Sequence, residues 1–319
     1  MGKTANAYPV SIRQVVPKLA MYKDFFHFNE MPFSLTPNTD FFCALAPHNE
    51  ALKVILTALS MSEGFIKVTG EVGTGKTLLC RKLINHLSDR FVACYLPNPY
   101  LSPDELRIAF AKELGIKTGK AKERVNLHNN IEEKLLSLKA EGRQAILIID
   151  EAQALSWDSL EILRLFSNLE TEKSKLLQIV LFGQPELNDN LDNQRVRQIR
   201  QRITFSYSLR KMTRAEVDYY IGHRLVTAGS DEGLIPRYLR PFIAFTSSGT
   251  PRLVNIVCHK LLLSVYGEGK AAATCKHLVS AILDTEDCRR RVLPQKRLFF
   301  LSLALVAALG TWQMTLGGL

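Results

Sequence analysis

The segment Gly70-Glu71-Val72-Gly73-Thr74-Gly75-Lys76-Thr77 decides the fold of this chain. It fits the pattern GxxxxGK[ST], in which glycines let successive backbone N–H groups wrap phosphates. A helix that begins here would add the favourable field of its N-terminus. Lys76 would reach the β- and γ-phosphates, and the hydroxyl of Thr77 would ligate Mg²⁺. We therefore predict that all eight residues bind a nucleotide.

The residues on either side of this loop supply the required context. Residues 65–69 alternate like a β-strand and run directly into the loop, and residues 78–87 repeat apolar side chains with helical spacing. A chance match to the pattern would not bring a strand before it and a helix after it. We therefore interpret residues 65–87 as a strand, a phosphate loop and a helix.

The chain after this helix continues to alternate strands and helices. Ser102-Pro103-Asp104-Glu105 is a capping box with proline at the first helical position. Residues 145–149 are apolar throughout, which is typical of a strand at the buried centre of a parallel sheet. The predicted elements are a strand at 91–96, helices from 103 to about 114 and over roughly 123–138, and strands at 145–149, 178–182 and 203–207. This pattern predicts an α/β fold with a parallel sheet.

Two acids, Asp150 and Glu151, directly follow the most apolar strand. At the carboxyl end of a central strand, an acid can reach both Mg²⁺ and an attacking water. We predict that Asp150 holds Mg²⁺ together with Thr77 and that Glu151 polarises the water. An incidental Asp-Glu pair is the other interpretation, but the order strand, phosphate loop, strand, strand with Asp-Glu defines a class of P-loop proteins that hydrolyse ATP. We therefore expect ATP and Mg²⁺ as ligands.

Gln184 and a group of arginines are further candidates. Gln184 follows the strand at 178–182, where it either senses hydrolysis between Glu151 and the γ-phosphate or simply opens the next helix. Four arginines precede the strand at 203–207, namely Arg195, Arg197, Arg200 and Arg202. They either form a solvated face or supply a cation to the γ-phosphate of a neighbouring subunit, as an arginine finger does.

From residue 209 onward the predicted elements are helices only. Thr213-Arg-Ala-Glu216 is a second capping box. The predicted helices run from this box to about 225, and then over 236–245, 252–266 and about 274–286. Arg252 stands in the first turn of the third helix, where it either points back to a phosphate in the preceding domain or lies on the surface. These residues predict an α-helical lid domain.

The positive charge of the chain lies near its two ends. The net charge is +10, but residues 1–21 hold three basic residues without an acid and residues 288–297 hold five, which leaves residues 22–287 at about +2. A nearly neutral body disfavours a DNA-binding face. The six cysteines form no CxxC pair and no metal-like spacing with the histidines, so we expect reduced thiols of a cytoplasmic body. His259 is expected to be a packed core residue.

The carboxyl terminus differs from the rest of the chain. Residues 298–319 form 22 positions without a charge, against about 20 needed to span a bilayer. The basic residues of 288–297 precede them, and such residues stay on the cytoplasmic side of a membrane. We predict a C-terminal transmembrane anchor, with an apolar helix packed on the body as the alternative. Residues 1–20 lack periodicity and a capping signal, and we predict that they are a dispensable extension, either a misassigned start or a disordered arm. They also lack the apolar run of a cleaved secretory signal.

Four motifs together resemble an AAA+ ATPase: the loop GEVGTGKT, the strand IIDEA, the arginine group ending in QRI, and GTPR at 249–252. Within this superfamily, residues 21–37 and LFGQPEL at 181–187 are similar to the ExeA/GspA secretion ATPases. Residues 64–83 and LPNPYLSPDEL at 96–106 most resemble the MshM-type proteins of mannose-sensitive haemagglutinin (MSHA) pilus biogenesis. The resemblance covers about residues 21–285.

The resemblance implies an oligomeric ATPase at the bacterial inner membrane that supports assembly of a type IV pilus or a type II secretion machine. Its implied partners are copies of itself, assembly proteins of the inner membrane and the lipid bilayer, without nucleic acid. The implied residue roles are Lys76 and Thr77 for phosphate and Mg²⁺, Asp150 for Mg²⁺, Glu151 for water, Gln184 as first sensor, Arg252 as second sensor, and Arg202 as finger ahead of its rivals Arg197 and Arg200. Longer members continue into a periplasmic peptidoglycan-binding domain, whereas this sequence ends at Leu319, so no direct grip on the cell wall is expected.

Other functions remain as alternatives. The first is a DNA-associated AAA+ ATPase of the transposition type, against which the membrane tail argues. The second is an interaction platform in which nucleotide only sets a conformation. A helicase would need a second motor domain, and a GTPase would need an NKxD segment. The predicted boundaries are an extension at 1–20, an AAA+ domain at 21–208, a lid at 209–287, a basic segment at 288–297 and a transmembrane helix at 298–319.

Overall fold

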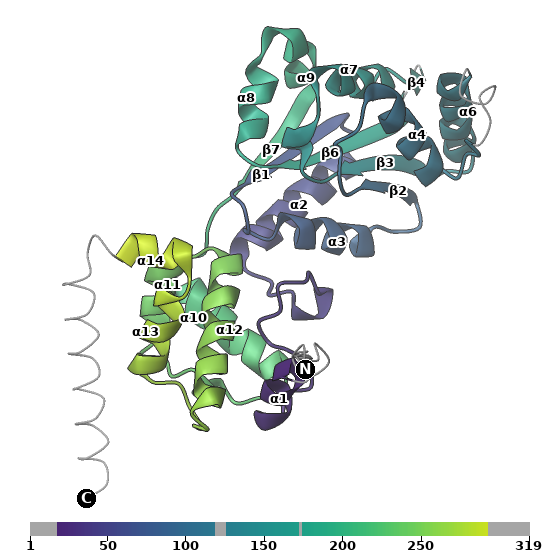
Figure 1. Ribbon diagram of the computed structural model, residues 1–319. Coiled ribbons are helices and arrows are strands. Elements are labelled where there is room, and N and C mark those ends of the chain that lie inside the picture. Colours follow the sequence, from purple (N-terminus) through teal and green to yellow (C-terminus); the bar gives the residue numbers. More distant parts are fainter. Residues whose placement is uncertain (1–17, 119–125, 172–173, 293–319) are drawn as a thin grey trace, which may run out of the picture. The chain divides into compact units, whose positions relative to one another are not determined.

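The structure is a computed structural model that describes residues 18–118, 126–171 and 174–292 (Figure 1). These residues form two compact units. The α/β unit comprises residues 37–211 and 250–252, and the helical unit comprises the described residues of 18–36, 212–249 and 253–292.

A five-stranded sheet forms the centre of the α/β unit. Its order is β2-β3-β6-β1-β7, and all neighbouring strands pair in parallel. β3 and β6 are buried at every position, whereas the edge strand β2 is partly half-buried and the edge strand β7 alternates half-buried with exposed residues before a buried last one. The strands span Phe65–Gly70 (β1), Phe91–Leu96 (β2), Gln144–Ile149 (β3), Leu177–Gly183 (β6) and Ile203–Leu209 (β7). The predicted α/β fold with a parallel sheet is confirmed.

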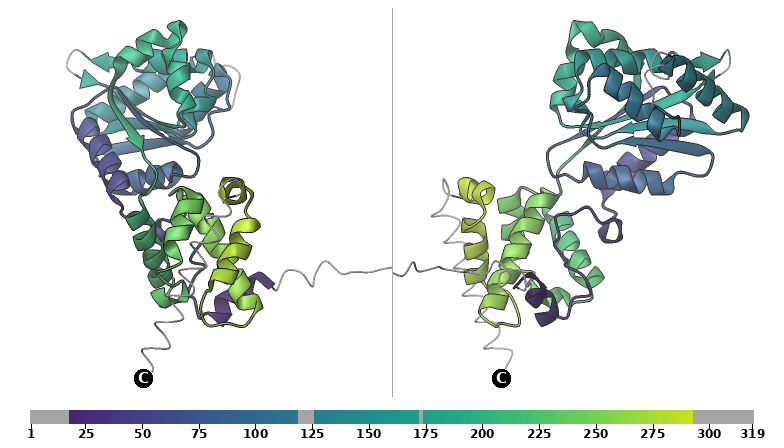
Figure 2. Two further views of the ribbon diagram at one scale, coloured as in Figure 1. Left: turned by 90° about the vertical axis from the view of Figure 1, so that its left-hand side faces the viewer. Right: turned by 45° about the vertical axis from the view of Figure 1, so that its right-hand side comes forward.

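Helices cover both faces of this sheet, which is the middle one of three layers (Figure 1, Figure 2). On one face α2 and α3 pack against Ile146 and Ile148, and on the other face α4, α6, α7, α8 and α9 pack against Leu147 and Ile149. Because side chains alternate along a strand, each central strand contributes to both cores. The helices span Ala46–Ser60 (α2), Lys76–His86 (α3), Pro103–Glu113 (α4), Leu127–Ala140 (α6), Trp157–Phe166 (α7), Glu186–Asp192 (α8) and Arg197–Arg202 (α9).

Short elements complete the α/β unit. They are the 3-10 turns at Thr39–Phe41 (η2), Ala152–Ala154 (η3) and Gln194–Val196 (η4), and the antiparallel strand pair Glu170–Thr171 (β4) and Ser174–Lys175 (β5).

The helical unit contains α1 and the helices α10 to α14. Their bounds are Lys18–Phe25 (α1), Arg214–Thr227 (α10), Arg240–Ser247 (α11), Pro251–Gly267 (α12), Cys275–Leu283 (α13) and Glu286–Val292 (α14), with a 3-10 turn at Glu232–Leu234 (η5). Both predicted capping boxes are confirmed, Ser102 with Glu105 before α4 and Thr213 with Glu216 before α10.

Residues 18–36 pack into the helical unit through contacts that span most of the chain. The buried guanidinium of Arg224 donates to the carbonyl oxygens of Pro32 and Ser34, about 190 residues earlier. A buried cation needs such acceptors. We predicted residues 21–36 as part of the α/β domain, and the structure instead places them in the helical unit.

His259 lies in the same unit, half-buried on α12. Its ring meets the buried Tyr22 ring edge to face at a centroid distance of 5.6 Å. Burial lowers the pKa of His259. This is the packed environment expected from the sequence.

Two lid helices differ from their predicted ranges. α11 begins at Arg240 rather than at residue 236, because Pro241 occupies its first turn, where a missing N–H costs least. The helix predicted over 274–286 is two helices, since α13 is capped at Asp284 and α14 starts at Glu286.

None of the helices within the described ranges combines the length and the apolar character that a bilayer crossing requires. The predicted anchor at 298–319 lies outside those ranges, as do residues 1–17 of the predicted extension and residues 293–297 of the basic segment. Residues 288–292 form the end of α14.

Candidate nucleotide-binding site

The carboxyl ends of three neighbouring strands bring the predicted site residues together. β3 ends before Asp150 and Glu151, β6 ends before Gln184, and β1 ends at the loop that contains Lys76. These strands are adjacent in the order β3-β6-β1. In open α/β sheets, ligands bind in the crevice outside the carboxyl ends of the strands.

The loop at 70–77 needs glycine at two positions. Gly73 and Gly75 have φ angles of 78° and 98°, values that residues with a side chain rarely adopt. A Cβ on Gly73 would lie 2.7 Å from the Cβ of Arg252, and one on Gly75 would lie 3.0 Å from the Nε2 of His48. The loop is therefore enclosed from two sides, and α3 begins directly after Gly75.

Lys76 is a buried cation, 5% exposed. Its Nζ donates to the carbonyl oxygens of Gly70 at 2.7 Å and Glu71 at 3.1 Å. Burial lowers the pKa of the ammonium, and the carboxylates of Glu151 and Asp150 oppose that effect. Two of its three donors thus have acceptors among the described residues, and both acceptors are neutral carbonyl groups that do not balance its charge. An anion such as a phosphate would satisfy this ammonium better.

Thr77 and Asp150 form an oxygen pair suited to Mg²⁺. The Thr77 Oγ1 donates to the Asp150 Oδ2 at 2.7 Å, and the Glu151 N–H donates to the other carboxylate oxygen at 3.0 Å. Burial, together with the nearby carboxylate of Asp150, raises the pKa of the Tyr95 hydroxyl on β2. Burial raises the pKa of Asp150, while the Thr77 and Glu151 donors lower it. A hydroxyl and a carboxylate are the ligands that Mg²⁺ takes in phosphate sites.

Glu151 lies beside this pair and is held by two amides. Its Oε2 accepts from the Gln153 Nε2 at 2.6 Å and from the Gln184 Nε2 at 3.0 Å. Burial, the strongest single influence, acts to raise the pKa of Glu151, but the two amide donors and the charge of Lys76 outweigh it and leave that pKa below its usual range. The backbone φ of Glu151 is 53°, a conformation that costs a non-glycine residue of the order of 1–3 kcal/mol and often marks a functional site.

Gln153 connects the two strand ends. Its Oε1 accepts from the Gln184 N–H at 2.9 Å, and its own carbonyl accepts from the Asn190 side chain at 2.9 Å. Gln184 therefore contacts Glu151, as expected for a sensor of hydrolysis. It also lies just before α8, as expected for a residue that opens the next helix.

Arg252 contacts the loop through its backbone. The Arg252 N–H donates to the Gly73 carbonyl at 3.2 Å, and the side chain is exposed. The structure thus places the predicted second sensor next to the phosphate loop.

Arg202, the predicted arginine finger, lies at the amino-terminal end of the strands, opposite to the end that carries the phosphate loop. It precedes the first residue of β7, and β7 runs parallel to β1 with Phe65 opposite Ile203 and Gly70 opposite Leu209. Six strand residues therefore separate it from the loop, about 20 Å at the usual rise. Its Nη1 donates to the Ser167 Oγ at 2.5 Å.

The two rival arginines differ in their partners. Arg200 forms an exposed ion pair with Asp192 at 2.7 Å. The Arg197 side chain is exposed and makes no hydrogen bond or ion pair with any residue in the described part of the chain. Arg195 lies over the ring of Trp157, with its guanidinium carbon 4.9 Å from the ring centroid.

Sequence reasoning missed three residues at the site, namely His48, Tyr95 and Gln153. Tyr95 is the next-to-last residue of β2, and polar residues at the ends of neighbouring strands are a signal that could have identified it. Gln153 is visible in Asp150-Glu151-Ala152-Gln153, but its role depends on the neighbouring β6. His48 gives no local signal, because α2 was not predicted.

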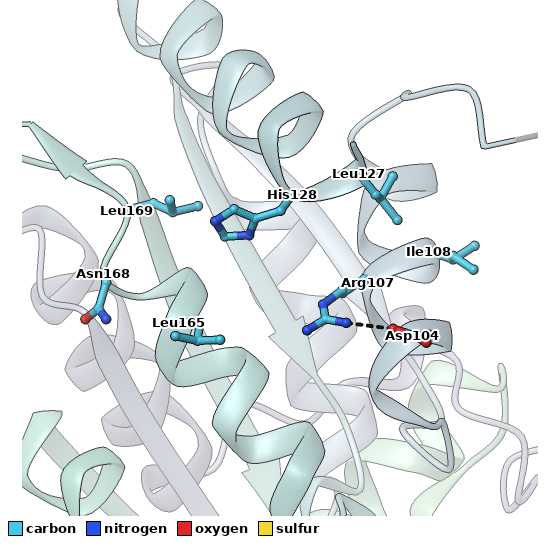
Figure 3. A pocket seen from close by; sticks show the side chains of 8 residues that line it. All are labelled: Asp104, Arg107, Ile108, Leu127, His128, Leu165, Asn168 and Leu169. Atoms are coloured by element: carbon cyan, nitrogen blue, oxygen red, sulfur yellow. Dashed lines mark hydrogen bonds and ion pairs between the residues drawn. The ribbon is translucent and has the colours of Figure 1, made fainter. Parts of the chain in front are cut away.

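A separate groove of about 620 Å³ lies among α4, α6 and α7 (Figure 3). Asp104 and Arg107 of α4 form an ion pair at its wall at 2.6 Å. His128 of α6 points into it, and the partly exposed Leu165 of α7 lines it. Its lining includes none of the residues predicted as functional, so this groove is distinct from the phosphate loop.

Residues 59–191 match a known protein family, the AAA domain. Its sheet, its P-loop and the acids after β3 are the features described above, so the fold class predicted from the sequence is confirmed for this part of the chain.

A curated relative extends the likeness beyond the AAA domain. The chain is 35% identical over 301 residues to general secretion pathway protein A of Aeromonas hydrophila. The match covers 92% of this chain and 54% of that protein, so the chain spans about half the length of this relative.

Solved structures show the same fold at low identity. The ORC2 protein of Aeropyrum pernix, in ADPNP-ADP complexes, has a TM-score of 0.63 at 14% identity and covers 81% of this chain and 72% of its own. Cdc6p of Pyrobaculum aerophilum has a TM-score of 0.62 at 17% identity, covering 79% and 70%. At these identities the likeness concerns the fold alone.

Proposed function

We propose that this chain is an ATPase that binds Mg·ATP at residues 70–77 and hydrolyses the ATP with Glu151. The observation that supports this most directly is the convergence of Lys76, Asp150 and Glu151 at one edge of the AAA sheet, with Gln184 between them. A buried ammonium, an oxygen pair for a divalent cation and an ionised carboxylate are the three groups that phosphoanhydride hydrolysis needs.

Each group has a separate task. The loop amides and Lys76 bind the phosphates, and Thr77 and Asp150 hold Mg²⁺. An Mg²⁺ held there would supply positive charge to offset the negative charge of the phosphates. Glu151 accepts a proton from the attacking water, and its lowered pKa keeps it ionised for that purpose. Gln184 joins Glu151 to the end of β6 and reports the state of the γ-phosphate.

The chain acts as an oligomer in this proposal. Arg202 lies too far from its own loop to reach a phosphate there, so it would serve the site of a neighbouring copy. Arg252 would serve as the second sensor for the phosphate loop of its own copy, because its backbone already contacts Gly73.

The cellular role is assembly of a secretion machine or of an MSHA-like type IV pilus. General secretion pathway protein A supports the secretion part through its identity over almost all of this chain. The pilus part rests on the likeness of residues 64–83 and 96–106 to MshM-type proteins. The partners would be other copies of the chain and assembly proteins of the inner membrane.

The chain would be anchored in the bacterial inner membrane by residues 298–319, with the ATPase body in the cytoplasm. The basic residues of 288–297 support this orientation. Carbonate extraction of membranes tests it: full-length protein should stay in the pellet and a version ending at Arg297 should be released. Release of the full-length protein by carbonate would reject the anchor.

A DNA-associated ATPase is not favoured. The likeness to ORC and Cdc6 proteins concerns the fold alone, and residues 22–287 carry a net charge of only about +2.

A strain whose chromosomal gene carries Lys76→Ala tests the cellular role. We expect loss of surface pili or of secreted protein at normal levels of the variant, measured by immunoblots of sheared and secreted fractions. Normal assembly of both machines would reject the proposed role.

A further inference from the structure

His48 touches the phosphate loop from outside. It belongs to the first turn of α2, which lies beside α3 on the same face of the sheet (Figure 1). The side chain is 7% exposed, and its Nε2 lies 3.0 Å from the carbonyl oxygen of Thr74. A carbonyl oxygen only accepts, so the Nε2 carries the proton and donates.

This bond controls the direction of a donor on the other side of the loop. The Thr74–Gly75 peptide is trans, since the described chain contains no cis peptide bond. In a planar trans peptide, the C=O and the following N–H point in opposite directions. With the Thr74 carbonyl held toward His48, the Gly75 N–H points away from His48. Gly75 is the N-cap of α3, so this N–H is one of the donors that a helix start offers to an anion.

The imidazole is itself held in place. The Phe42 ring meets it edge to face at 6.0 Å and an angle of 86°, and the Lys82 Nζ lies 5.3 Å from the centroid of that same ring. On the loop side, the space between the Nε2 and Gly75 would not admit a Cβ without a contact of 3.0 Å. A donor whose own position is fixed loses little freedom when it fixes another group.

We propose that His48 is a positioning residue that orients the Thr74–Gly75 peptide so that the Gly75 N–H faces a nucleotide phosphate. The inference rests on the proposed binding of ATP. It assigns to α2, outside the GxxxxGK[ST] motif, a share in nucleotide affinity. Loss of one hydrogen bond of this kind corresponds to roughly a three- to tenfold loss of affinity.

The test compares three variants of the full chain by titration with a fluorescent ADP analogue in the presence of Mg²⁺. His48→Phe keeps a ring against Phe42 but has no donor, and we expect it to bind about three- to tenfold more weakly than wild type. His48→Gln can donate from its amide and should bind within about twofold of wild type. Lys53→Ala, at an exposed position of the same helix, is the matched control and should bind as wild type does.

Steady-state ATP turnover supplies a second readout. A positioning role predicts that His48→Phe raises KM for ATP by a similar factor, with kcat changed less, and that His48→Gln restores KM. Wild-type affinity in His48→Phe would overturn the inference. So would an equal loss in His48→Phe and His48→Gln accompanied by a lower melting temperature of both, because that result indicates packing alone. Failure of the wild-type chain to bind nucleotide would instead reject the proposed function, and the inference with it.

Discussion

Lys76 in the α/β unit and Arg240 in the helical unit are both buried cations, 5% and 2% exposed, but their surroundings differ. Arg240 is saturated by its own chain: it donates to the carbonyls of Ile235, Asp218 and Glu232 and to the carboxylates of Asp218 and Glu232. Lys76 has two loop carbonyls, and burial lowers its pKa. A saturated buried cation holds a fold together, whereas an unsaturated one marks a site for an anion.

The arginines before β7 represent a third environment. They lie at the surface or half-buried, and the guanidinium hydrogen bonds and ion pairs described for them are those of Arg202 with Ser167 and of Arg200 with Asp192. Such cations can reach another molecule at small cost, which suits a role between subunits.

Substitution of Arg202, the proposed arginine finger, should give the largest effect on ATP turnover. Arg202→Ala is expected to lower ATP turnover by about 10³ or more, because the developing charge on the γ-phosphate loses its external cation. Mixing inactive Arg202→Ala subunits with inactive Lys76→Ala subunits should restore part of the turnover. Arg197→Ala and Arg200→Ala serve as comparisons, and a comparable loss in either one, with normal Arg202→Ala, would transfer the role to that residue.

Substitution of Arg240, the buried cation whose hydrogen bonds are satisfied within the chain, should affect the stability of the fold and not the binding of nucleotide. Arg240→Met leaves buried carbonyls without a donor and is expected to lower the free energy of unfolding by about 3 kcal/mol. Urea denaturation measures this. Arg237→Ala is the control, because its contact with the same Glu232 is long and exposed and should contribute less than about 0.5 kcal/mol. Equal losses of stability in the two variants would show that the buried hydrogen bonds of Arg240 do not hold the fold together.

The unsaturated cation should show the reverse pattern. Lys76→Met is expected to weaken binding of Mg·ATP roughly tenfold to hundredfold, through loss of a charged hydrogen bond to phosphate. The nucleotide-free variant should be as stable as wild type or more stable, since a buried charge has been removed. A large loss of stability with unchanged affinity would mean that Lys76 is structural. Lys53→Met, at an exposed position of α2, provides the control.

The amides around Glu151 should give the smallest effect. Gln153→Leu removes a donor from Glu151 and an acceptor from the Gln184 N–H, and about a tenfold fall in kcat is expected. Affinity for ATP should remain within about twofold, because Gln153 contacts no loop residue in the bonds described. An unchanged kcat would show that the amide network does not position Glu151.

Local sequence patterns were enough to predict the centre of the α/β unit. The strand at 91–96 is found at its predicted bounds, and those at 65–69, 145–149 and 178–182 are found within two residues of theirs. Strand and loop signals lie within a few residues of one another, so a short window contains them. Asp150 and Gln184 were found because each directly follows a strand, and Lys76 was found from the GxxxxGK[ST] pattern.

Contacts between distant segments could not be predicted in this way. His48 meets Thr74 across 26 residues, and Arg224 meets Pro32 across 192. The sequence around Arg224 predicts an ordinary amphipathic helix, and no element was predicted around His48. Each polar contact exists only once its unit has folded. The same reason explains why residues 21–36 were assigned to the wrong unit.

The central claim is that Glu151 is the base of an ATPase, and one variant tests it most directly. The account predicts that Glu151→Gln lowers ATP turnover by about 10²–10⁴ while its affinity for Mg·ATP stays within a few-fold of wild type, because Lys76, Thr77 and Asp150 are unchanged. Purified wild type and variant are compared by phosphate release and by nucleotide titration. Turnover by Glu151→Gln within a few-fold of wild type would contradict the claim, and so would a wild-type chain that binds ATP as an oligomer but does not hydrolyse it.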